Sequence, residues 1–77
     1  MLDHLRAIAG CDRPWAAERA RFVVEITESY NAGTITRPEY EELCRDVLRT
    51  DRLDSEADDI ELKTALVTAI YAVAQLS

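Results

Sequence analysis

The sequence predicts an all-α protein, a small bundle of three to four helices built as a single domain over residues 1–77. Apolar residues recur with the three- and four-residue spacing of amphipathic helices, and signals for helix starts and stops separate the periodic segments. The chain has 77 residues, and this length leaves room for one compact core. The four helices are expected at about residues 2–9, 14–32, 36–50 and 55–76.

The first two helices are separated by a short turn. Leu2, Leu5 and Ile8 recur at three-residue spacing and predict a helix over 2–9 that ends near Gly10. Pro14 then marks the start of the second helix, because proline is tolerated at the first helical position. One face of the second helix is expected to enter the core and carries Trp15, Phe22, Val23, Ile26 and Tyr30.

The third helix has the clearest start signal. Thr36 is followed three residues later by Glu39, which is the spacing of a capping box. Gly33 lies just before this signal and suits the left-handed position that commonly follows a helix. The apolar positions of the helix match the amphipathic pattern; they are Tyr40, Leu43, Cys44, Val47 and Leu48.

The fourth helix is expected to start at a cap provided by Asp54 or Ser55, with acidic residues in its first turns. From Ala65 to Leu76 it is apolar nearly all round. Such a helix is normally buried on more than one side, whereas a domain of this size leaves roughly 40% of its unfolded-chain surface exposed. We therefore expect this helix to present an apolar face to another molecule.

The charge balance bears on the class of partner. The net charge is −6, and the basic residues form no continuous block in the sequence. Direct binding of nucleic acid is therefore not expected. The longest uncharged run, residues 64–77, is shorter than the roughly 20 residues that cross a bilayer. No signal peptide is visible at the N-terminus. The expected location is the cytoplasm.

Residues that could carry chemistry are few. His4 is the single histidine, so neither a catalytic triad nor a histidine metal site can be assembled. Cys11 and Cys44 are far apart and are expected to act as small apolar groups. The acidic stretch from Asp54 fails the calcium-loop pattern, which requires glycine where Asp59 stands. We predict no enzymatic activity, no catalytic residues, no cofactor and no metal.

A helix–turn–helix stretch at residues 26–48 resembles the SHOCT-type helical hairpin, a short C-terminal domain of many bacterial and phage proteins. The resemblance is carried by Ala32-Gly33, Ile35-Thr36, Glu39-Tyr40, Leu43, Val47 and Leu48. It implies an interaction or oligomerisation element with no catalytic residues. The stretch is internal here and an apolar helix follows it, which suggests a freestanding bundle built around the hairpin. Small acidic helical proteins of this kind are common in phage genomes.

Two functions follow as hypotheses. The first is a protein–protein interaction or assembly module, which would include a phage-encoded structural or accessory protein in the host cytoplasm or the virion. It would bind a protein partner or a second copy of itself through the fourth helix, at Leu62, Leu66, Ala69, Ile70, Val73 and Leu76. The second is an acidic inhibitor or antitoxin-like protein. It would bind a basic host protein through carboxylate-rich helix faces, at Glu39, Glu42, Asp46, Asp58 and Asp59.

Overall fold

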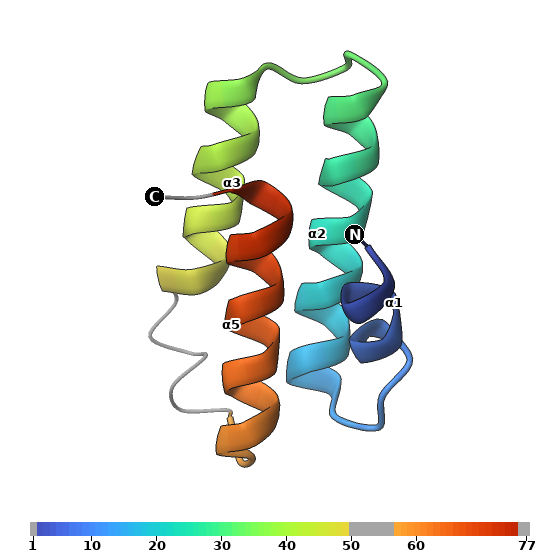
Figure 1. Cartoon of the computed structure of the whole chain (residues 1–77), viewed down its shortest axis with the longest axis vertical. Coiled ribbons are helices and arrows are strands. Elements are labelled where there is room, and N and C mark those ends of the chain that lie inside the picture. Colours follow the sequence, from blue (N-terminus) through green and yellow to red (C-terminus); the bar gives the residue numbers. More distant parts are fainter. Residues whose placement is uncertain (1, 50–56, 76–77) are drawn as a thin grey trace.

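The computed structural model describes residues 2–49 and 57–75, and these residues form four helices and no strand (Figure 1). The predicted all-α bundle is confirmed. The helices are α1 (Asp3–Ala9), α2 (Pro14–Asn31), α3 (Arg37–Arg49) and α5 (Ile60–Ala74). The first three match their predicted bounds to within a residue at each end.

The fourth helix starts later than predicted. Asp59 is its N-cap, and its carboxylate accepts a hydrogen bond of 3.0 Å from the backbone N–H of Leu62. Asp58, which precedes the cap, accepts a 3.1 Å hydrogen bond from Trp15 Nε1, and Arg13 Nε lies 3.3 Å from the same oxygen. These contacts tie residue 58 to the start of α2 before the helix begins. The cap predicted at Asp54 or Ser55 lies outside the described residues, and Asp59 takes that role.

The α2–α3 turn is set by local sequence, as predicted. Gly33 has a φ of +80°, the left-handed conformation that costs a glycine little. The N–H groups of Gly33 and Thr34 donate to the carbonyls of Tyr30 and Ser29 at 3.0 and 2.9 Å, the pattern of a Schellman motif. The end of α2 therefore carries a helix stop signal, and the start of α3 carries a helix start signal.

The predicted capping box is confirmed at the start of α3. The Thr36 N–H donates to Glu39 Oε1 at 3.0 Å, and the Glu39 N–H donates to Thr36 Oγ1 at 3.3 Å. Glu39 Oε1 also accepts a 2.9 Å hydrogen bond from the Thr36 hydroxyl. The backbone N–H of Thr36, as the largest cause, and the Thr36 hydroxyl lower the pKa of the Glu39 carboxyl. The box satisfies two backbone donors that the first turn of the helix leaves without partners.

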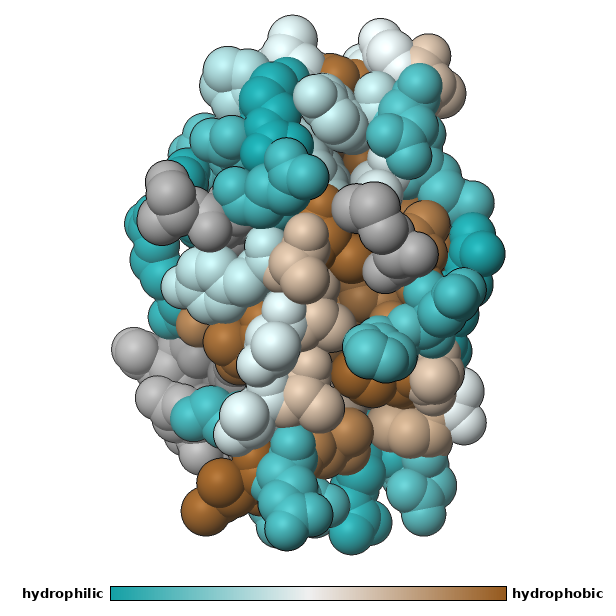
Figure 2. Space-filling model, in the orientation of Figure 1, coloured by the Kyte–Doolittle hydropathy of each residue, from teal (hydrophilic) through white to brown (hydrophobic). Residues whose placement is uncertain are grey.

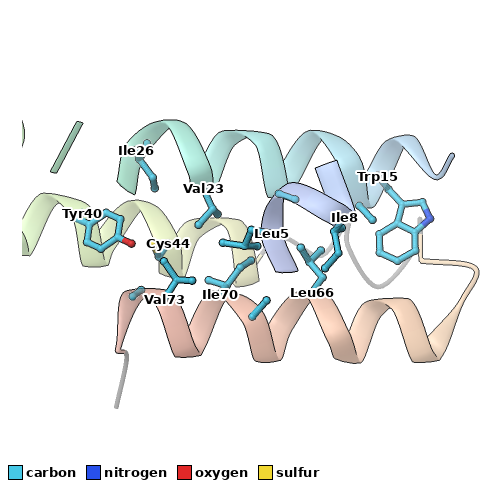
Figure 3. Packing of buried hydrophobic residues seen from close by; sticks show 14 residues of the cluster. Leu5, Ile8, Trp15, Val23, Ile26, Tyr40, Cys44, Leu66, Ile70 and Val73 are labelled. Carbon is cyan, nitrogen blue, oxygen red and sulfur yellow. The ribbon is translucent and has the colours of Figure 1, made fainter. Parts of the chain in front are cut away.

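The core lies between α2 and α5, with α1 and α3 closing its sides (Figure 3). α1 contributes Leu5, which is fully buried, and Ile8. Trp15 is 7% exposed and anchors the core near the start of α2. The buried apolar cluster comprises Leu5, Ile8, Trp15, Ala16, Ala20, Val23, Ile26, Tyr40, Cys44, Leu66, Ala69, Ile70, Val73 and Ala74.

Two positions of α2 differ from the predicted core stripe. Phe22 was expected inside but is 38% exposed, whereas Thr27 is buried although it is polar. Alanines occupy much of the buried face of α2: Ala16, Ala17 and Ala20 are all buried where this helix meets its neighbours. Small side chains let helix backbones approach closely, so a pattern read from large apolar residues alone places the stripe imperfectly.

Candidate functional site

α5 buries one face and exposes the other. Leu66 and Ile70 are fully buried, and Ala69 and Val73 are 6% and 9% exposed. These four side chains were predicted to contact a partner, and that prediction has to be corrected because they pack inside the chain's own core. Leu62 is half-buried against the same core. Leu76 lies outside the described residues.

The opposite face of α5 remains accessible. Ile60 is 81% exposed and Tyr71 is 46% exposed. Small residues lie between them, and their side chains are exposed as well. We call this surface the α5 outer face; it comprises Ile60, Glu61, Thr64, Ala65, Thr68, Tyr71 and Ala72.

The α5 outer face carries very little charge. Its one charged residue is Glu61, in the first turn of α5, and from Thr64 to Gln75 the sequence has no charged residue. Figure 2 shows small, weakly polar to apolar residues running along α5, with more hydrophobic surface beside them. In a protein with 31% charged residues, such a stretch differs from an ordinary solvated helix face.

Two hollows flank this helix. A groove of about 590 Å³ runs between α1 and α5 and has a mainly apolar lining, made by His4, Ala7, Ile8, Ala65, Thr68, Ala69 and Ala72. A second hollow of about 410 Å³ is lined by Ile60, Lys63, Thr64, Val67 and Thr68. Thr68 belongs to both linings, so it stands on the ridge between the two hollows.

A third cleft, of about 510 Å³, opens at the end of the bundle where Tyr30, Arg37 and Tyr40 meet. The two tyrosine rings stack with centroids 4.9 Å apart, and the Arg37 guanidinium lies 5.6 and 5.7 Å from the two centroids. Arg37 donates to Glu41 at 2.8 Å and to the Ala74 carbonyl at 2.6 Å. The hydrogen bond and charge of Glu41 raise the pKa of Arg37. These contacts join α3 to the end of α5, which is a structural role.

The nucleophile and metal-ligand candidates are dispersed. Cys44 is a buried free thiol whose pKa is raised by burial, and Cys11 is a half-buried free thiol. His4 is exposed on α1 at the rim of the apolar groove. Over residues 2–49 and 57–75, no group of three or more His, Cys, Asp or Glu side chains is placed to hold a metal ion.

The predicted acidic face separates into two kinds of residue. Glu39 belongs to the capping box, Asp58 contacts Trp15, and Asp59 caps α5. Glu42 and Asp46 are exposed one turn apart on α3. Three of the five acids thus have local structural partners.

Comparisons with known proteins found no matching family model, no matching curated protein and no matching solved structure. The resemblance of residues 26–48 to the SHOCT-type hairpin therefore stays a prediction. Among the helices described, none is both long enough and apolar enough to span a membrane.

Proposed function

We propose that this protein is a non-enzymatic protein–protein interaction module whose binding surface is the α5 outer face with the adjoining α1–α5 groove. The observation that carries the proposal is the exposure of Ile60 and Tyr71 on a helix face that has no charge from Thr64 to Gln75. Apolar surface that water must otherwise hydrate favours burial against a partner.

The dimensions of the surface suit a helical or flat partner. α5 has 15 residues, which at 1.5 Å rise per residue gives a face roughly 22 Å long. Ala65, Thr68 and Ala72 are small, so a partner backbone can approach closely. The groove beside them offers room for the larger side chains of that partner. Aromatic residues are enriched at protein interfaces, and Tyr71 is such a residue on this face.

The role implied by the SHOCT-like hairpin is compatible with this proposal, because it too is an interaction or assembly element. A phage-encoded structural or accessory protein of the host cytoplasm or virion would be one form of such a module. In this proposal α2 and α3 support α5 rather than contact the partner.

Site-specific photo-crosslinking in cells of the source organism tests the proposal. A photoreactive amino acid replaces Ala72 on the α5 outer face, and a matched variant carries it at the exposed Glu42 on α3. We expect adducts of higher mass from position 72 and few from position 42. Absence of adducts at position 72 would contradict the proposal.

A second candidate is the acidic inhibitor or antitoxin-like binder. The exposed carboxylates of Glu42 and Asp46, with Glu39 on the same side of α3, favour it. Attraction between this acidic face and a basic protein accelerates association at low salt and is screened at high salt. The same photo-crosslinking can be repeated in a lysate at increasing salt concentration. Adducts that form at position 42 and disappear at high salt would support this candidate over the first.

A further inference from the structure

We draw no further inference here: the strongest candidate, the apolar groove between α1 and α5 together with the α5 outer face beside it, belongs to the site already described, and nothing in the described part of the structure shows what covers it.

Discussion

The hydroxyl groups of Thr27 and Tyr40 lie 2.6 Å apart in the buried contact between α2 and α3. Thr27 also donates a hydrogen bond of 2.7 Å to the carbonyl of Val23. A threonine hydroxyl has a single hydrogen, so Tyr40 must be the donor in the bond to Thr27. The tyrosine is 1% exposed, and this bond satisfies its buried phenol.

A double-mutant cycle measures this pair. Thr27→Val leaves the buried Tyr40 hydroxyl without its acceptor and should lower the free energy of unfolding by about 1–3 kcal/mol. Tyr40→Phe removes the donor and should cost about 1 kcal/mol. The double variant should cost less than the sum of the two, since both polar groups are then gone. Additive urea-unfolding free energies would contradict the assigned bond.

Stability should fall at alkaline pH. Burial raises the pKa of Tyr40 and of the Cys44 thiol above their ordinary values of 10.0 and 9.0. The unfolded chain therefore loses these protons first, so stability is full below pH 9.0 and declines as the pH rises through 9.0 and 10.0. Urea midpoints measured against pH should decline less steeply for Tyr40→Phe. Equal slopes for wild type and variant would argue against the role of Tyr40.

The stability that the capping box contributes should be lost in acid. The pKa of Glu39 is lowered from an ordinary value of 4.5, so its contribution is present above that pH and is lost as the pH falls through the lower folded-state pKa. Glu39→Gln should reduce stability at pH 7 and much less at low pH. Thr36→Ala should cost about 1 kcal/mol at pH 7. Glu42→Gln, on the same helix, is the control and should change the urea midpoint little.

Two isoleucines of α5 distinguish its faces. Ile70 is fully buried and Ile60 is 81% exposed. Ile70→Ala should lower the free energy of unfolding by about 2–5 kcal/mol, whereas Ile60→Ala should change it by about 0.5 kcal/mol or less. Thermal and urea unfolding of the two variants supply the comparison. Comparable losses would show that the burial assigned to α5 is wrong.

The contact between Trp15 and Asp58 fixes the residues that precede α5. Asp58→Ala removes the acceptor of the Trp15 Nε1–H bond and should cost about 1 kcal/mol. The protein has one tryptophan, so a shift in its fluorescence emission reports the change directly. Asp46→Ala, an exposed acid on α3, should shift neither the emission nor the stability appreciably. An unchanged emission in Asp58→Ala would contradict this contact.

Local signals in the sequence determined the helices and most of their ends. The capping box of Thr36 and Glu39, the stop at Gly33 and the start at Pro14 act through hydrogen bonds and backbone angles within a few residues. Such signals can therefore be read without knowing the fold. The start of α5 is the exception, because Asp59 is one acid among several neighbours that could each cap a helix.

The tertiary structure alone decided which face of α5 is buried. Its apolar residues surround the helix, so periodicity could not separate the side that meets α1, α2 and α3 from the side left open. Leu66 and Ile70 are buried and Tyr71 is exposed, because helix packing selects the face that best fits the neighbouring side chains. The candidate site is therefore on the predicted helix, yet on residues that sequence reasoning did not select.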